Sequence, residues 1–278
     1  MRLPESSTSA GAAGLAAILA EPARALVAVD YDGTLAPIVE RPGEAVPHPE
    51  AVATLGRLAG VVGVVAVITG RPVEDVLQLG GMRSAAGLGR LVVLGQYGLE
   101  RYDAATGART MPEPSAGVSF ARSRLRRLLE VAGVPPAVAI EDKGSALVVH
   151  TRRLPDPDAT LERLRAPLAA LAERAGLEAV PGRLVVELRP AGTDKGRALT
   201  RLARARGAGA VLFAGDDIGD LPAYDAVERL RAEGVPGVTV CSDSAEVTVL
   251  RERADIVVDG PAGVVALLAA LTAAIGAG

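Results

Sequence analysis

Residues 25–37 read ALVAVDYDGTLAP, an apolar run that ends in Asp30 and Asp32 and continues through Gly33 and Thr34. The continuous hydrophobicity of 26–29 predicts a buried strand of a parallel sheet. If the chain stays extended, residues 30 and 32 point the same way, and their carboxylates repel each other. A divalent cation bound through oxygen ligands would relieve this repulsion, and a solvated acidic turn is the alternative.

Composition narrows the classes of protein that the rest of the chain can form. The 278 residues carry a formal net charge of -3, 49% are hydrophobic and 2% are aromatic, which is typical of a globular protein and offers no basic or stacking surface for nucleic acid. Cys241 is the only cysteine, which excludes an intramolecular disulfide and favours a cytoplasmic location. The apolar segments 11–20 and 260–278 are interpreted as packed helices, not as a signal peptide or membrane span.

The chain alternates strand and helix patterns at both ends, which predicts parallel βαβ units. We expect strands at 26–29, 62–68, 91–94, 210–214, 237–241 and 256–258, with helices at 49–58, 72–80, 193–206, 220–231 and in the tail. The middle of the chain differs, with helices at 115–130 and 158–174 and two hairpins, the second turning at Pro181-Gly182. We therefore predict an α/β core over 1–101 and 190–278, interrupted by an α+β insert over 102–189.

Another expected strand ends at Thr69-Gly70-Arg71. A hydroxyl followed by glycine offers an O–H group and closely approachable backbone amides to an oxyanion. A helix N-cap by Thr69 is the alternative explanation. Because ligands of open parallel sheets bind beyond the carboxyl ends of the strands, this loop is a candidate part of a site.

Lys195 opens a helix within AGTDKGRAL, and lysine is rare here: only Lys143 and Lys195 occur among 30 basic residues. A compact ammonium at a helix start suits phosphate binding, although an Asp-capped helix with an exposed lysine would look the same. The stretch LFAGDDIGD then places Asp216, Asp217 and Asp220 after another apolar run, which favours hard-cation binding over an acidic turn.

These motifs occur in the order Asp-x-Asp-Gly-Thr, Thr-Gly, Lys and Gly-Asp-Asp-x-x-Asp, and together they resemble the haloacid dehalogenase-like superfamily of phosphotransferases. The acid at position 32 is similar to the general acid of its phosphatases and phosphomutases. Three further stretches, VLGQYGLER, IEDKGSALVVHTR and VVELRPAGTDKG, resemble the trehalose-phosphate phosphatase family. Gly219-Asp220-Leu221 departs from that family's usual Thr-Asp-Glu, and Thr151 stands where an aromatic residue is common.

The resemblance implies a Rossmann-like core with an inserted cap domain and the Mg²⁺-dependent hydrolysis of trehalose 6-phosphate. It implies that Asp30 is the nucleophile, that Asp32 is the general acid/base, and that Thr69 and Lys195 grip the phosphoryl group. It places the metal with Asp30, the backbone carbonyl of Asp32, Asp216, Asp217 and Asp220. The implied substrate-binding residues are Gly70, Arg71, Glu141, Lys143, His150 and Glu187.

Several alternatives stay open. A related phosphatase of sucrose or glycosylglycerate phosphates, or a sugar-phosphate sensor without turnover, would carry similar motifs. His150 equally fits a supporting role in its hairpin, and Arg71 fits a core salt bridge better than a substrate contact. We expect a monomer, with a trehalose-phosphate synthase as the candidate protein partner.

Overall fold

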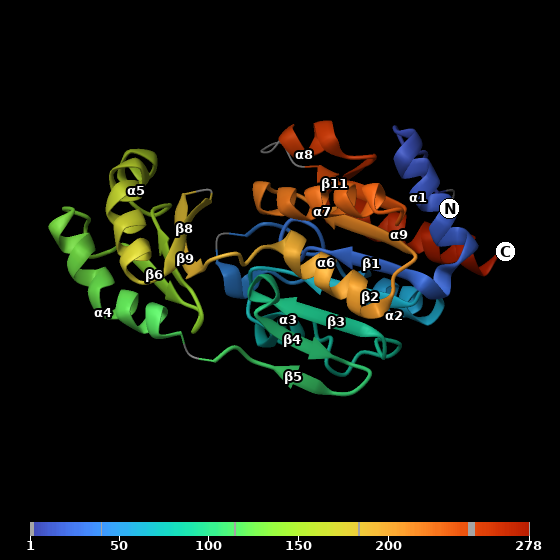
Figure 1. The fold of residues 1–278 in the computed structure, drawn as a ribbon, viewed down its shortest axis with the longest axis horizontal. Helices are drawn as coiled ribbons and strands as arrows, with labels where there is room; N and C mark the ends of the chain where they lie inside the picture. The colour runs from blue at the N-terminus through green and yellow to red at the C-terminus, as the bar shows by residue number, and fades with distance from the viewer. Residues whose placement is uncertain (1–2, 40, 114, 183, 244–247, 278) are drawn as a thin grey trace. The chain divides into compact units, whose positions relative to one another are not determined.

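The computed structural model describes residues 3–39, 41–113, 115–182, 184–243 and 248–277. The chain divides into two compact units. The first comprises Met1–Thr110 and Asp194–Gly278, and the second comprises Met111–Thr193. The colours of Figure 1 show that the first unit is built from both ends of the sequence and the second from its middle.

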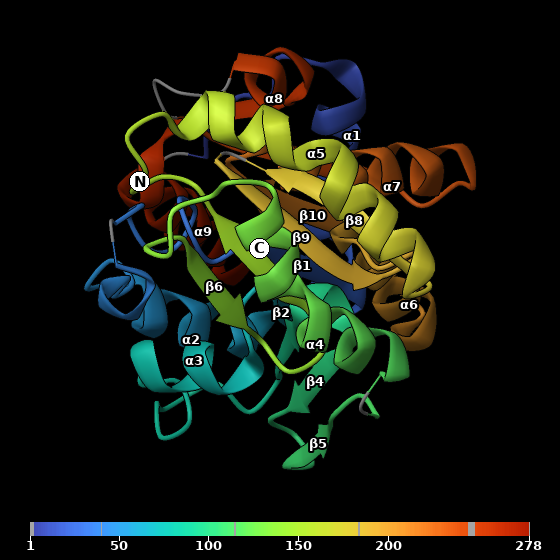
Figure 2. The same ribbon diagram turned by 90° about the vertical axis from the view of Figure 1, so that its left-hand side faces the viewer.

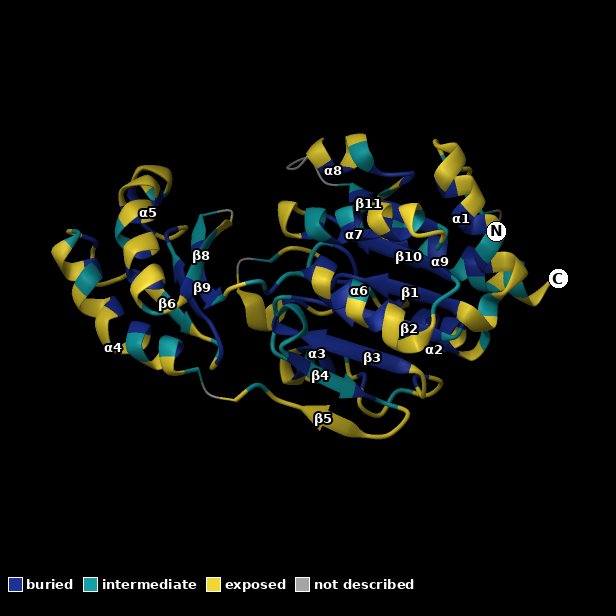
Figure 3. Cartoon of the chain, viewed as in Figure 1, coloured by how far each residue is buried: buried dark blue, intermediate teal, exposed yellow. Residues whose placement is uncertain are grey.

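Within the described residues, the first unit contains an eight-stranded sheet in the order β12-β11-β10-β1-β2-β3-β4-β5. All neighbours from β12 to β3 pair in parallel, which confirms the predicted α/β class. The parallel strands are β1 (Ala25–Val29), β2 (Val64–Ile68), β3 (Leu91–Gly95), β10 (Ala210–Gly215), β11 (Gly237–Asp243) and β12 (Ile256–Asp259). The central ones are buried along their whole length, as Figure 3 shows, which explains their unbroken apolar sequences.

Helices cover both faces of this sheet, so that alternate strand residues enter two separate apolar layers. One face packs against α1 (Ser9–Ala20), α2 (Ala51–Val61), α3 (Val73–Leu79) and α9 (Gly260–Gly276). The opposite face packs against α6 (Lys195–Arg206), α7 (Leu221–Ala232) and α8 (Thr248–Arg253). Val27 belongs to the first layer, whereas its neighbours Leu26 and Ala28 belong to the second, as the two-residue period of a strand requires.

The boundary of the insert differs from the prediction because two strands were missed. The strands β4 (Glu100–Asp103) and β5 (Ala108–Thr110) form an antiparallel hairpin that extends the core sheet beyond β3. Residues 102–110 therefore belong to the first unit, and the second unit runs to Thr193, not to position 189. Both strands are polar, and β5, at the edge of the sheet, is exposed throughout, so they lack the apolar pattern that identified the other strands.

The second unit is a four-stranded antiparallel sheet in the order β6-β7-β9-β8. Its strands are β6 (Ala139–Asp142), β7 (Leu147–His150), β8 (Leu177–Gly182) and β9 (Val185–Pro190). The helices α4 (Ala116–Val131) and α5 (Pro157–Arg174) cover one face, where Leu147, Val149, Val186 and Leu188 join a common core. Figure 2 shows both helices of this unit from a second direction.

The second hairpin of this unit turns later than its sequence suggested. Pro181 pairs with Val186 and Gly182 with Val185, so both residues belong to β8 and do not form the turn. Leu184 lies in the turn with φ of 56°, while position 183 lies outside the described residues. Proline is tolerated in β8 because β8 is an edge strand of this sheet.

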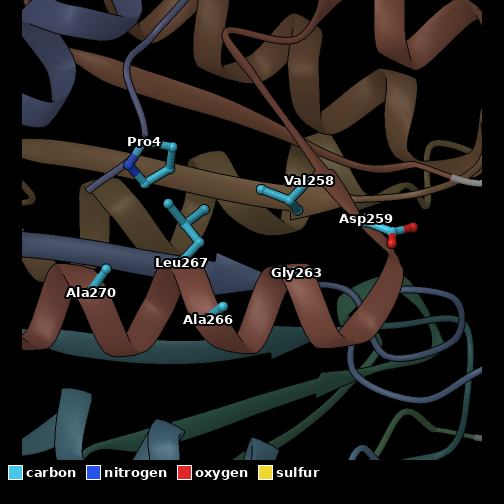
Figure 4. A pocket seen from close by; sticks show the side chains of 7 residues that line it. All are labelled: Pro4, Val258, Asp259, Gly263, Ala266, Leu267 and Ala270. Carbon is cyan, nitrogen blue, oxygen red and sulfur yellow. The ribbon is translucent and has the colours of Figure 1, made fainter. Parts of the chain in front are cut away.

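A pocket of about 260 Å³ lies in the first unit, between Pro4, the end of β12 and one side of α9 (Figure 4). Its lining is aliphatic apart from Asp259, so it offers no set of groups for catalysis. None of the described helices combines the length and the hydropathy that crossing a bilayer requires.

The exposed glycine Gly60 near the end of α2 provides a test of the helix assignment. A Cβ at this position would meet no atom within 4 Å. We expect Gly60→Ala to raise the free energy of unfolding by about 0.5–1 kcal/mol, because alanine loses less backbone entropy than glycine in a helix. Urea denaturation checks this, and a lower stability of the variant would contradict the helical assignment.

Candidate active site

The strand register brings the predicted site residues of the core to one edge of the sheet. Val29 pairs with Ala214 on one side and with Val67 on the other, so β1, β10 and β2 end side by side. Asp30 follows β1, Thr69 follows β2 and Asp216 follows β10. The carboxyl ends of three neighbouring parallel strands thus carry the three predicted motifs, as expected for a ligand site in an open sheet.

A buried ammonium group lies among these carboxylates. Lys195 is the first residue of α6, and its Nζ lies 2.9 Å from Asp30 Oδ1 and 2.7 Å from Asp220 Oδ1. All three side chains are buried. Burial alone would lower the pKa of Lys195, but Asp220 and Asp30 together raise that pKa well above its ordinary value. Lys195 therefore stays charged and holds the nucleophile candidate Asp30 in place.

One lysine does not balance the negative charge of the cluster. Burial raises the pKa of Asp216 to about 8, and the neighbouring carboxylates of Asp220 and Asp217 add to this rise. Burial also raises the pKa of Asp30 well above its usual range, against the opposing effect of Lys195. Asp30, Asp216 and Asp220 each have a carboxylate oxygen within 4.8 Å of the others. This all-oxygen donor set fits a hard divalent cation, which would favour the ionised carboxylates.

The residues after β1 are fixed by a tight turn against Asp216. Gly33 has φ of 74°, and a Cβ at this position would lie 2.0 Å from Asp216 Oδ2. The Thr34 hydroxyl donates to Asp216 Oδ1 at 3.4 Å, and the Ser242 hydroxyl donates to the Gly33 carbonyl at 2.7 Å. The Asp-Gly-Thr sequence therefore brings the β1 loop directly against the carboxylate that follows β10.

The second aspartate of the opening motif is paired with an arginine. Asp32 receives two hydrogen bonds of 2.7 Å, from Nε and Nη2 of Arg71. Arg71 also donates to the carbonyl of Pro42 and lies over the ring of Tyr31. The two carboxylates at the end of β1 are therefore unequal: Asp30 is buried beside Lys195, whereas 40% of the Asp32 side chain is exposed.

Asp217 and Asp220 shape the loop after β10. The Asp217 carboxylate accepts from the Gly219 amide at 2.9 Å, and Asp220 Oδ2 accepts from the amides of Asp216 and Asp217. Asp220 is fully buried, and both of its oxygens already have protein partners, whereas Asp217 is exposed. These contacts suit residues that orient Asp216. Within the cluster, Asp220 therefore mainly holds the loop and Lys195 in position.

The loop after β2 lies beside this cluster in the sheet order. Thr69 is buried, and its hydroxyl accepts from the Arg71 amide at 3.2 Å. Gly70 packs against the ring of Tyr97. Thr69 and Gly70 therefore lie directly after the carboxyl end of β2, and their role in oxyanion binding stays a prediction.

In the second unit, the predicted residues form two pairs on the sheet. Lys143 Nζ donates to Glu187 Oε1 at 3.0 Å, and His150 Nε2 lies 3.0 Å from Glu141 Oε2. Glu187 pairs across the strands with Val148 and alternates with the core residues Val186 and Leu188, so it belongs to the face opposite α4 and α5. The four residues thus offer two carboxylates, a cation and an imidazole on one sheet.

Several partners of these residues were not predicted from the sequence. Arg189 lies on the same face as Glu187, and it bridges Glu187 and Glu178 through salt bridges of 3.5 and 3.1 Å. Ser242 and the turn at Gln96–Gly98 also contact predicted site loops. The alternation of polar residues along VVELRP was a usable signal for Arg189, whereas the contact of Ser242 with Gly33 joins positions too far apart in sequence to be read from it.

The fold is that of haloacid dehalogenase-like hydrolases. A solved hydrolase of this class from Bacteroides thetaiotaomicron has a TM-score of 0.61 at 15% identity, covering 87% of this chain and 97% of its own. The C-terminal domain of Candida albicans trehalose-6-phosphate phosphatase has a TM-score of 0.75 at 20% identity, covering 98% of this chain and 99% of its own.

Within this class, the chain belongs to the trehalose-phosphatase family, whose sequence model matches residues 28–255. A trehalose-phosphate phosphatase of Mycobacterium avium is 34% identical over 247 residues, which cover 84% of this chain. The matched region spans 59% of that relative's length. The residues matched by the family include all of the core site described above and the residues Glu141, Lys143, His150 and Glu187 of the second unit.

The contact of Gly33 with Asp216 gives a prediction about the site. Gly33→Ala would push the Asp216 carboxylate away, and a displacement of about 1 Å can lower kcat by about 10²-fold. The matched control is Gly81→Ala, because Gly81 also has a positive φ of 59°, but a Cβ there would meet no atom within 4 Å. Phosphate release from p-nitrophenyl phosphate measures both, and equal losses in the two variants would show that backbone strain alone is responsible.

Proposed function

We propose that the protein is a Mg²⁺-dependent trehalose-6-phosphate phosphatase that releases trehalose and inorganic phosphate through an aspartyl-phosphate. The observation that carries this proposal is the buried cluster of Asp30, Asp216 and Asp220 around Lys195, at the carboxyl ends of parallel strands. Family membership supports the choice of substrate.

Asp30 is the nucleophile in this proposal. Asp30, the backbone carbonyl of Asp32 and Asp216 hold the cation, while Asp217 and Asp220 orient these ligands. When bound, Mg²⁺ supplies positive charge that favours ionised Asp30 and offsets the charge of the phosphoryl oxygens. A carboxylate oxygen of Asp30 attacks phosphorus, and the bond from phosphorus to the sugar oxygen breaks. Lys195 and the Thr69 hydroxyl bind the phosphoryl oxygens as charge moves onto them.

Asp32 transfers the protons. It protonates the departing sugar oxygen, then takes a proton from the water that attacks phosphorus and frees Asp30 with inorganic phosphate. Each oxygen of Asp32 accepts one hydrogen bond from the Arg71 guanidinium in this structure, and each keeps a second lone pair that can take the transferred proton.

The second unit recognises the sugar. Glu141, Glu187 and Lys143 can accept and donate hydrogen bonds to hydroxyl groups, and His150 orients Glu141. Charged hydrogen-bonding groups discriminate strongly, because a substrate without the matching hydroxyls leaves them unpaired.

A substrate panel tests the function. We expect trehalose 6-phosphate to be hydrolysed at least about tenfold more efficiently than sucrose phosphate or glycosylglycerate phosphates, a difference of about 1.4 kcal/mol. Asp30→Asn should reduce turnover to background while the protein stays folded. A stronger preference for another sugar phosphate would reject the substrate, and phosphate release by Asp30→Asn would reject the nucleophile. Binding of trehalose 6-phosphate without turnover in Mg²⁺ would instead indicate a sensor.

Lys143 separates recognition of the sugar from the chemical step. Lys143→Ala removes a charged donor, so we expect kcat/KM for trehalose 6-phosphate to fall about 10–100-fold. For p-nitrophenyl phosphate, which has no sugar, the change should stay within about threefold. Steady-state kinetics on both substrates measure this difference, and equal losses would remove the sugar-binding role of Lys143.

A further inference from the structure

The connection between β3 and β4 adopts an unusual backbone conformation. Gln96, Tyr97 and Gly98 have φ values of 47°, 58° and 87°. The left-handed region costs L-residues such as glutamine and tyrosine about 1–2 kcal/mol each. Two successive non-glycine residues persist there only when surrounding contacts fix them, and such positions cluster at functional sites. The contacts of this turn identify what it supports.

The turn binds the carbonyl groups of the loop that follows β2. The Tyr97 amide donates to the Thr69 carbonyl at 2.9 Å, and the Gln96 amide donates to the Arg71 carbonyl at 2.9 Å. In a planar trans peptide, the C=O and N–H groups point in opposite directions. Fixing the Thr69 carbonyl on the turn therefore directs the Gly70 amide to the other side of the loop. The turn thus holds two carbonyl acceptors of the loop, those of Thr69 and Arg71, on its own side.

The side chain of Tyr97 adds a second constraint on the same loop. A Cβ on Gly70 would lie 2.7 Å from the Tyr97 hydroxyl oxygen, 2.9 Å from Cζ and 3.3 Å from Cε1. These are the three nearest atoms to that position, and Gly70 itself has no positive φ. Tyr97, and not backbone strain, is therefore the obstacle that a side chain at position 70 would meet.

A buried carboxylate ties the far side of the turn to α3. Glu100 Oε2 accepts from the Val73 amide at 2.7 Å, at the first residue of the helix, where Pro72 offers no side-chain cap. The other oxygen of Glu100 accepts from the Gln96 side chain. The 69–73 segment is thus held at both ends by residues of a single short stretch, 96–100.

We propose that the Gln96–Gly98 turn is a brace for the phosphate-binding loop 69–71, with Tyr97 as its positioning residue. This role rests on the proposed function, since it concerns the loop assigned to the phosphoryl group. Because the brace acts on the phosphate side and not on the sugar, disturbing it affects every phosphate ester alike. It also explains why Gln96 and Tyr97 stay in a strained conformation.

A double-mutant cycle between Gly70 and Tyr97 tests the brace. The variants are Gly70→Ala, Tyr97→Asn and both together, with Gly60→Ala as a matched alanine control remote from the site. Asparagine tolerates a positive φ but lacks the ring. The readouts are kcat/KM for p-nitrophenyl phosphate and trehalose 6-phosphate, the dissociation constant of inorganic phosphate by calorimetry, and the thermal unfolding midpoint.

We expect Gly70→Ala to lower kcat/KM about tenfold on both esters and to weaken phosphate binding, because its Cβ strikes Tyr97. Tyr97→Asn should cost about threefold, and the double variant should return to the level of Tyr97→Asn, since the collision is gone. Three results would overturn the proposed brace. Gly70→Ala could have no effect, the losses could be additive in the double variant, or the loss could be confined to trehalose 6-phosphate.

Failure of the brace and failure of the proposed function remain distinguishable. If the wild type showed no preference for trehalose 6-phosphate, or no turnover at all, the proposed function would be rejected. The dissociation constants of inorganic phosphate from the wild type and the variants would still test the brace. If Gly70→Ala did not fold, a comparison of Tyr97→Val with Tyr97→Asn would take its place. Valine is the informative substitution because a β-branched side chain opposes the left-handed conformation. The valine variant should then bind phosphate more weakly than the asparagine variant, and equal affinities would overturn the proposal.

Discussion

The contact of the Lys195 ammonium with Asp30 and Asp220 is the interaction on which the site depends. Buried charges are tolerated only when they are paired, and Lys195 pairs with two carboxylates, so it keeps one partner when the other is neutralised. Parallel strands end side by side, so the aspartates after β1 and β10 meet whether or not they repel. Lys195, at the start of α6, offsets part of that negative charge. The carboxylate of Asp216, which lies near Asp30, is not balanced, among the described residues, by a second cation of this cluster. The fold thus produces a buried site with excess negative charge, which suits a divalent cation.

Sequence reasoning predicted the parts of the fold that packing imposes on local sequence. Strands such as β1 and β10 are buried on both faces, so their apolar runs and the aspartates behind them could be recognised. The β4–β5 hairpin is polar and lies at the sheet edge, so the predicted insert began too early. The turn after β8 was placed two residues early because Pro181-Gly182 is a good turn sequence, yet cross-strand pairing keeps both residues in the strand.

The types of residue in the site were predictable, but their pairing was not. Motif spacing identified Asp30, Thr69, Lys195 and Asp216, because each follows a strand or opens a helix. Nothing local indicated that Arg71 would take both oxygens of Asp32, or that Tyr97 would fix the loop at Gly70. These contacts join residues 39 and 27 positions apart in the sequence, and they appear only when the strand ends are placed together.

The most direct test of the acidic cluster is whether it binds a divalent cation. Thermal unfolding of the full chain is followed as Mg²⁺ is added to the wild type, to Asp216→Asn and to the exposed control Asp158→Asn. Binding to the folded state alone stabilises by about 2.7 kcal/mol at a hundredfold excess over the dissociation constant. We expect Mg²⁺ to raise the unfolding midpoint of the wild type and of Asp158→Asn, and Asp216→Asn to lose this response. An equal shift in all three proteins, or none in the wild type, would contradict a cation site at this cluster.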